Sequence, residues 1–90
     1  MLPRVFWLHM LDYSLAFGAS WQSGYRTVAH NHDVGGVDGS PHTHAVALDV
    51  TYDTSRPGDE ADRYLEQRGL RRLDEGTHDH IQPLGWENHP

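Results

Sequence analysis

Apolar and polar residues alternate in the N-terminal part of the chain. The apolar members of this alternation are Leu11, Tyr13, Leu15 and Phe17. Because successive side chains of a strand point to opposite faces, a period of two predicts a β-strand over residues 5–17. Residues 25–30 predict a second, short strand that ends at His30, and residues 18–24 form a small polar break between the two.

The clearest predicted strand covers residues 42–54. Its apolar side chains on one face are Val46, Leu48, Val50 and Tyr52. Residues 31–41 before it are rich in glycine and end in Ser40-Pro41, which is typical of a loop. A connection of this length is too short for a parallel crossover, so strands 25–30 and 42–54 are predicted to pair in antiparallel fashion.

Residues 55–69 predict an α-helix. Pro57 suits the first helical position, and the acids Asp59 and Glu60 place negative charge near the positive end of the helix dipole. Gly69 is expected to end the helix. The stripe along one side of the helix consists of Ala61, Tyr64, Leu65 and Arg68. A strand pair and one helix cover a sheet poorly, so we expect a truncated copy of a longer domain.

Composition narrows the function. Ninety residues make one domain, 1–90, whose small core would benefit from a metal or an oligomer. There is no cysteine, so a metal would be held by histidine and carboxylate groups. The net charge of −6, with arginine as the only cationic residue type besides histidine, argues against a nucleic-acid partner. No stretch approaches the roughly 20 apolar residues that span a membrane. With no signal-peptide pattern either, a soluble, cytoplasmic protein without a membrane partner is expected.

The eight histidines are clustered. Seven fall into two groups, which are His30, His32, His42 and His44, and then His78, His80 and His89. On a strand, His42 and His44 would share a face and could bind one metal ion. With His30, or with His32 in its place, they would leave one coordination position of a zinc ion open, as a catalytic site requires. The alternative is a pair of solvated histidines at the mouth of a strand.

The second candidate constellation is Asp79-His80. A histidine held by a carboxylate is a common general acid–base unit, because the carboxylate fixes the imidazole tautomer. Neighbours on a strand face opposite ways, so contact between these two would require a loop or a helix start. Residues 77–81 are equally typical of a polar loop, and residues 70–73 predict a short turn after the helix.

The order of these motifs resembles the 6-pyruvoyl-tetrahydropterin synthase and 6-carboxytetrahydropterin synthase family. The similar features are Ala29-His30, a glycine-bearing loop, His42-Thr43-His44 opening a strand, a helix, Asp79-His80 and Glu87-Asn88-His89-Pro90. They cover about residues 25–90 and leave 1–24 outside. The family motif continues beyond its Glu-Asn-Pro with Thr-x-Glu, which indicates a chain truncated at its C-terminus.

The resemblance implies an α+β tunnelling fold, in which an antiparallel sheet carries helices on one face and subunits assemble into homo-oligomers. It implies Zn2+ on His30, His42 and His44, with Asp79 and His80 in a catalytic relay. Asp38 stands where the family has a catalytic cysteine and could still take a proton. The implied activity is a lyase acting on 7,8-dihydroneopterin triphosphate, a small-molecule pterin, as 6-carboxytetrahydropterin synthase does in queuosine biosynthesis.

Two alternatives belong to other classes. Gly36, His42, His44 and Asp49 partly fit the first motif of a cupin-like metal-binding barrel, although the predicted helix does not suit a barrel. The other alternative is a degenerate fragment without catalysis. Metal content and helix content would separate these hypotheses.

Overall fold

The computed structural model describes residues 1–25, 27 and 42–86. Two helices and four strands follow one another within these described residues. They are α1 (Pro3–Phe17), β1 (Ala19–Ser23), β2 (Leu48–Tyr52), α3 (Asp59–Glu66), β3 (Leu70–Asp74) and β4 (Asp79–Pro83). The strands form a single sheet in the order β1-β2-β4-β3, and every neighbouring pair is antiparallel. The expected α+β class with an antiparallel sheet is confirmed.

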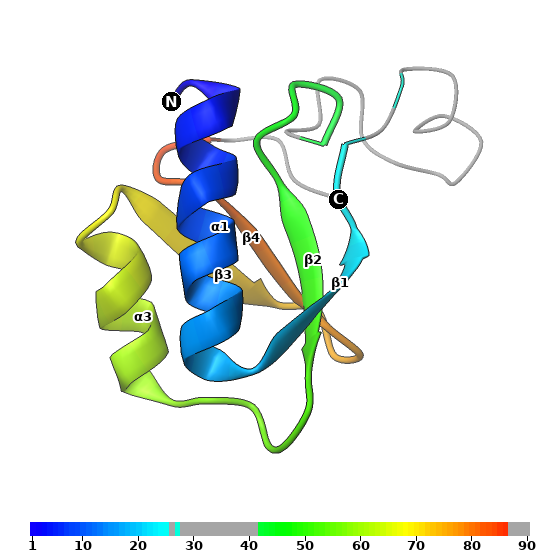
Figure 1. Cartoon of the computed structure of the whole chain (residues 1–90), viewed down its shortest axis with the longest axis vertical. Helices are drawn as coiled ribbons and strands as arrows, with labels where there is room; N and C mark the ends of the chain where they lie inside the picture. Colours follow the sequence, from blue (N-terminus) through cyan, green and yellow to red (C-terminus); the bar gives the residue numbers. More distant parts are fainter. Residues whose placement is uncertain (26, 28–41, 87–90) are drawn as a thin grey trace.

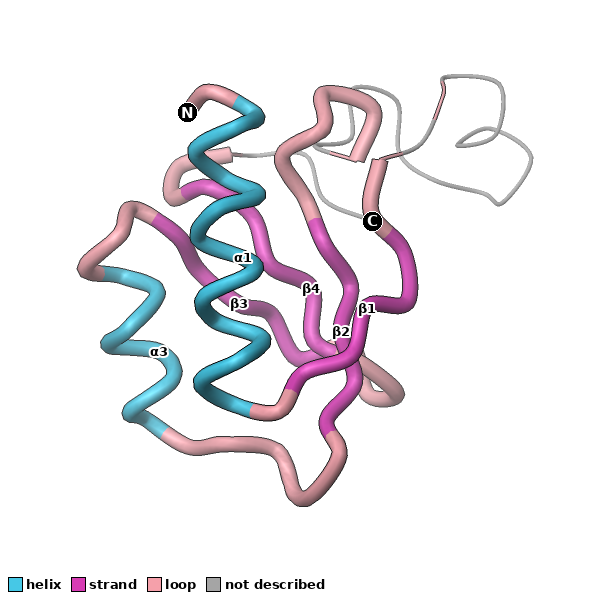
Figure 2. The backbone as a smooth tube through the Cα atoms, in the orientation of Figure 1, coloured by secondary structure: helices cyan, strands magenta, loops and turns pink. Residues whose placement is uncertain are grey.

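Both helices lie on the same side of this sheet (Figures 1 and 2). The core between the two layers contains Phe6, Met10, Tyr13, Val46, Leu48, Val50, Ala61, Leu65, Leu70 and Ile81. Leu48 pairs with Ile81 across β2 and β4, so both side chains point toward the helices. The intervening pair, Asp49 and His80, therefore points to the opposite face of the sheet.

The strand predicted over residues 5–17 is wrong, because this segment is helix α1. The residues that pack against the sheet recur with the helical period and are Phe6, Met10, Tyr13 and Phe17. Pro3 stands in the first turn, where its missing N–H has no cost, and Gly18 ends the helix with a positive φ of 65°. Leu11 and Leu15, which suggested alternation, are exposed to solvent.

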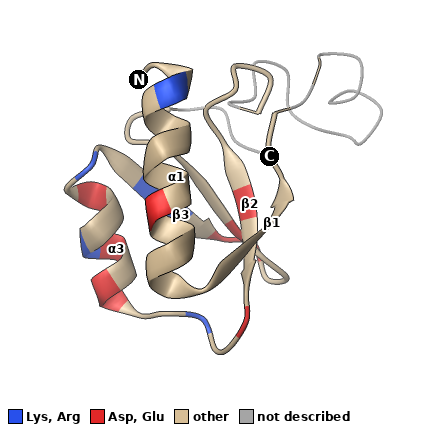
Figure 3. Cartoon of the chain, in the orientation of Figure 1, with Lys and Arg blue, Asp and Glu red and all other residues tan. Residues whose placement is uncertain are grey.

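The predicted helix over residues 55–69 is confirmed with narrower bounds, as α3. Its first turn carries three acidic residues, visible as a red group in Figure 3, and they favour the positive end of the helix dipole. Gly69 has a φ of 76° and turns the chain directly into β3. Residues 70–74 are thus a strand where a short turn was predicted.

The region around the predicted strand 42–54 also differs in detail. Residues 42–45 form turns, and β2 begins only at Leu48. Its partners are β1 and β4, while residues 28–30 of the expected partner strand lie outside the described part of the chain. Residues 79–83 form β4 where the sequence suggested a loop. Neither helix in the described ranges is long and apolar enough to cross a membrane.

Candidate metal centre

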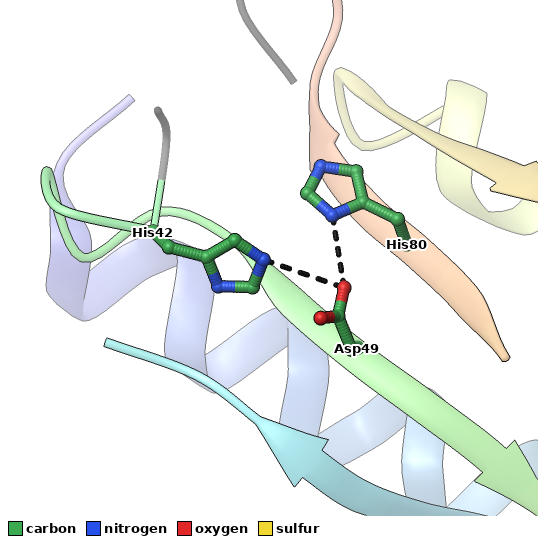
Figure 4. Close-up of side chains that lie close together, drawn as sticks. All are labelled: His42, Asp49 and His80. Atoms are coloured by element: carbon green, nitrogen blue, oxygen red, sulfur yellow. Dashed lines mark hydrogen bonds and ion pairs between the residues drawn. The ribbon is translucent and has the colours of Figure 1, made fainter. Parts of the chain in front are cut away.

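Three side chains converge on the face of the sheet opposite the helices (Figure 4). His42 comes from the turn before β2, Asp49 from β2 and His80 from β4. Asp49 Oδ1 lies 2.9 Å from His80 Nδ1 and 3.3 Å from His42 Nε2. His42 and His80 have no exposed surface, and Asp49 is 6% exposed. The group therefore sits inside the protein.

The antiparallel register explains how the chain assembles this group. Asp49 and His80 are directly opposite each other in β2 and β4, which puts their side chains on one face. His42 reaches the same point because residues 42–45 turn back before the strand, with the Ala45 N–H donating to the His42 carbonyl at 3.3 Å. A straight strand from residue 42 would have carried His42 away from Asp49.

The geometry fits a transition-metal ion. The three residues offer one ligand atom each, all within 4.8 Å of one another. Two ligand atoms bound to zinc at 2.0–2.1 Å with a tetrahedral angle lie about 3.3 Å apart, close to the spacing of His42 Nε2 and Asp49 Oδ1. Two imidazoles and one carboxylate also form the nitrogen and oxygen donor set that zinc accepts, with a fourth position left for water or substrate.

The surroundings favour Asp49 as an anion. Burial alone would raise the pKa of this carboxyl group, but the neighbouring His42 and His80 rings outweigh that effect and hold the pKa well below its usual range. A carboxylate that is ionised while buried is a ready ligand for a cation.

A third histidine stands at the rim of the group. His78 Nε2 lies 3.9 Å from Asp49 Oδ2, and the His78 side chain is 31% exposed. Thr77 Oγ1 lies 3.0 Å from His78 Nδ1. His78 also lines a pocket of about 220 Å³ at the end of β2, together with Tyr52, Arg56 and Thr77. His42, Asp49 and His80 do not line this pocket, so His78 is the link between the pocket and the buried group.

The residues predicted for the metal are distributed differently. His42 is in the group, but His44 is an exposed side chain whose ring lies 5.1 Å from that of Trp86. The two do not share a strand face, because residues 42–45 are turns. His30, its alternative His32 and the predicted catalytic Asp38 lie outside the described residues.

Asp79 and His80, predicted as one relay, point to opposite faces of β4. His80 joins the metal group, whereas Asp79 is buried on the helix side. There it accepts hydrogen bonds from Tyr52 at 2.6 Å, from Arg56 Nε at 2.8 Å and from Arg72 at 3.2 Å. Burial raises the pKa of the Tyr52 phenol, and the bond to Asp79 raises it further, so Tyr52 stays a neutral donor.

The zinc prediction left out His80, which was predicted for the catalytic relay, and Asp49, which appeared only in the cupin-like alternative. The sequence contained a signal for Asp49, because one acid interrupts the apolar run Val46–Val50. A charge at such a position is expected to be paired or to bind a metal. Its contact with His80 depends on the register between β2 and β4, which no local pattern reveals.

Ala45 provides a test of the turn that carries His42. It is a non-glycine residue with a φ of 59°. We expect Ala45→Gly to raise the free energy of unfolding by about 1 kcal/mol, because relief of roughly 1–2 kcal/mol of left-handed strain exceeds the entropy that glycine adds to the unfolded chain. Urea denaturation measures the change. Ala47→Gly, at a buried position without positive φ, should instead destabilise the protein, and equal losses in both variants would contradict the prediction.

Comparison with known proteins corrects the family. The sequence model of the Peptidase M15 family matches residues 7–82. No curated protein and no solved structure matches the chain. The match overturns the pterin synthase resemblance, and with it the lyase activity, the pterin substrate and the queuosine pathway. The two helices on a four-stranded sheet do not form a cupin-like barrel either. Since the match covers most of the chain, including His42, Asp49 and His80, this protein belongs to the Peptidase M15 family.

Proposed function

We propose that this protein is a zinc-dependent peptidase whose metal is held by His42, Asp49 and His80. The observation that carries the proposal is the convergence of these three buried donors within 4.8 Å, in a chain of a peptidase family. M15 peptidases are zinc-dependent hydrolases, and the donor set leaves the open position that a catalytic zinc needs.

Zinc bound by three protein ligands polarises a carbonyl group and lowers the pKa of water toward neutrality. The protein's own contribution is positional. The two sheet residues Asp49 and His80 hold the ligand set on a rigid scaffold, and burial keeps bulk water from the ligand atoms. Because a buried charged group is costly without a counterion, the Asp49 carboxylate also selects for a bound cation.

His78 is suited to exchange a proton with the reacting peptide. Its Nε2 faces Asp49 from 3.9 Å, while the ring retains solvent access. It is therefore near the ligand group without being part of it. We assign to His78 Nε2 the transfer of a proton from the attacking water to the departing amine, as the C–N bond of the peptide breaks and the new C–O bond forms.

Cleavage of peptides tests the proposal. Zinc-loaded protein should cleave a mixture of short peptides, as followed by mass spectrometry, and a chelator should stop cleavage until zinc is restored. His78→Gln should lower turnover about 10²–10⁴-fold, the usual contribution of general acid–base catalysis, and should leave one zinc per chain. Cleavage that continues in chelator would contradict metal dependence. A zinc-loaded chain that cleaves no peptide would contradict the peptidase assignment.

A further inference from the structure

Behind His80, on the same face of β4, lies a second fully buried polar side chain, Gln82. Residues two apart on a strand share a face, so Gln82 stands beside the His80 imidazole. Its Oε1 is 2.7 Å from His80 Nε2. His80 Nδ1, the other ring nitrogen, is the one that faces Asp49 at 2.9 Å. Gln82 therefore contacts His80 on the side away from the metal group.

The orientation of the Gln82 amide is determined by a second contact. Its Nε2 donates to the Trp86 carbonyl at 3.0 Å. A flipped amide would bring two oxygen acceptors, Gln82 Oε1 and the Trp86 carbonyl, together without a proton between them. Gln82 Oε1 must consequently face His80, and an amide oxygen can only accept. Asp49 Oδ1 faces Nδ1 at 2.9 Å, so without a metal each ring nitrogen has an acceptor beside it. When a metal ion takes the lone pair of Nδ1, the proton of the neutral His80 ring is held on Nε2 by Gln82.

The geometry points to Gln82 as a positioning residue of the metal centre, which fixes the tautomer of His80 so that Nδ1 is its ligand atom. The inference rests on the proposed zinc site. Metal-bound histidines commonly donate their second ring N–H to an oxygen acceptor, and loss of that acceptor typically weakens metal binding 10–100-fold. Gln82 does not touch the metal group itself and acts through His80.

The tautomer of His42 is fixed in a similar way, with the roles of the two ring nitrogens exchanged. Its Nδ1 donates to the Gly24 carbonyl at 2.6 Å, so the lone pair of the neutral ring is on Nε2, the atom 3.3 Å from Asp49. The Gly24 backbone can come this close because it has no side chain. A Cβ there would lie 2.9 Å from the Trp7 ring, which packs between Phe6 and Trp21. Since the second nitrogen of each ring can donate to an oxygen, both rings would offer a lone pair to a metal ion beside Asp49.

Two substitutions of Gln82 test whether this side chain positions the His80 ring or only fills space beside it. Gln82→Met keeps a similar volume but removes the acceptor. Gln82→Glu, as a neutral acid, keeps an oxygen that can accept from His80 Nε2 and a hydroxyl that can donate to the Trp86 carbonyl. Gln22→Met makes the same chemical change at an exposed glutamine of β1 and is the matched control. Zinc affinity is measured by competition with a chelator. The bound nitrogen is identified by NMR from coupling between ¹¹³Cd and ¹⁵N-labelled histidine rings.

We expect Gln82→Met to bind zinc 10–100-fold more weakly and to lose the uniform coupling to His80 Nδ1. Gln82→Glu should restore both, and Gln22→Met should change neither. Unchanged affinity and coupling in Gln82→Met would overturn the inference, as would Gln82→Glu being as impaired as Gln82→Met while circular dichroism shows both variants folded.

If the wild-type chain binds no metal at all, the proposed function fails independently of Gln82. The ¹⁵N shifts of the metal-free His80 ring then decide the inference. A proton on Nε2 in the wild type that is redistributed in Gln82→Met supports the positioning of His80. The same tautomer in both proteins overturns it.

Discussion

Replacement of His80 by alanine is expected to abolish stoichiometric zinc binding, and replacement of His42 or Asp49 should do the same. Each residue supplies one of the three donors that the described part of the chain brings together. Loss of a direct ligand should therefore cost more than the 10–100-fold that follows loss of a contact behind a ligand. Metal analysis after dialysis, together with chelator competition, measures the effect. Peptide cleavage should fall to the level of the chelated wild type.

His44→Ala is the matched control. His44 belongs to the same turn region as His42, but it is exposed and lies against Trp86 outside the group. This variant should retain one zinc per chain. The opposite pattern, with zinc lost in His44→Ala and kept in His80→Ala, would contradict this site. It would instead support the zinc ligands predicted from the sequence, which include His44.

The histidines themselves were informative, since His42 and His80 were both singled out from the sequence. A histidine cluster in a chain without cysteine indicates metal or acid–base chemistry whatever the fold. The same chemistry occurs on unrelated folds, however, so the motifs could not identify the family. The predicted shared strand face of His42 and His44 does not form, for a geometric reason. His42 and His44 share a face only in a straight strand, and the left-handed Ala45 breaks that strand.

The helices show where local patterns are sufficient. α3 has its acids in the first turn and Gly69 after its end, so it could be predicted from local signals alone. For α1, the alternation from Leu11 to Phe17 competed with the helical spacing of Phe6, Met10 and Tyr13. The helix is favoured because it packs these three residues against the sheet. β4 had no comparable local signal, because its strand conformation comes from pairing with both β2 and β3.

Asp79→Asn is expected to destabilise the whole protein. Asp79 is 1% exposed and neutralises Arg72, which is itself 8% exposed and also binds Asp62 and the carbonyls of Pro57 and Gly58. Removing one partner of a buried ion pair typically costs about 3–5 kcal/mol, and we expect the lower end of this range because Arg72 keeps Asp62 at 2.7 Å. A domain of this size has a total stability of only roughly 5–15 kcal/mol. Urea denaturation should show a large fall in the transition midpoint.

Asp74→Asn is the control for this prediction, because Asp74 lies opposite Asp79 in the β3–β4 pair but is exposed. We expect its free energy of unfolding to stay within about 0.5 kcal/mol of the wild type, as is usual for surface substitutions. The comparison also tests whether Asp79 stabilises the fold or takes part in catalysis with His80, as the sequence predicted. If Asp79 stabilises the fold, the folded fraction of Asp79→Asn still binds one zinc through His42, Asp49 and His80. A variant of normal stability that binds zinc but has lost turnover would instead place Asp79 in the reaction, in spite of its position on the helix side of the sheet.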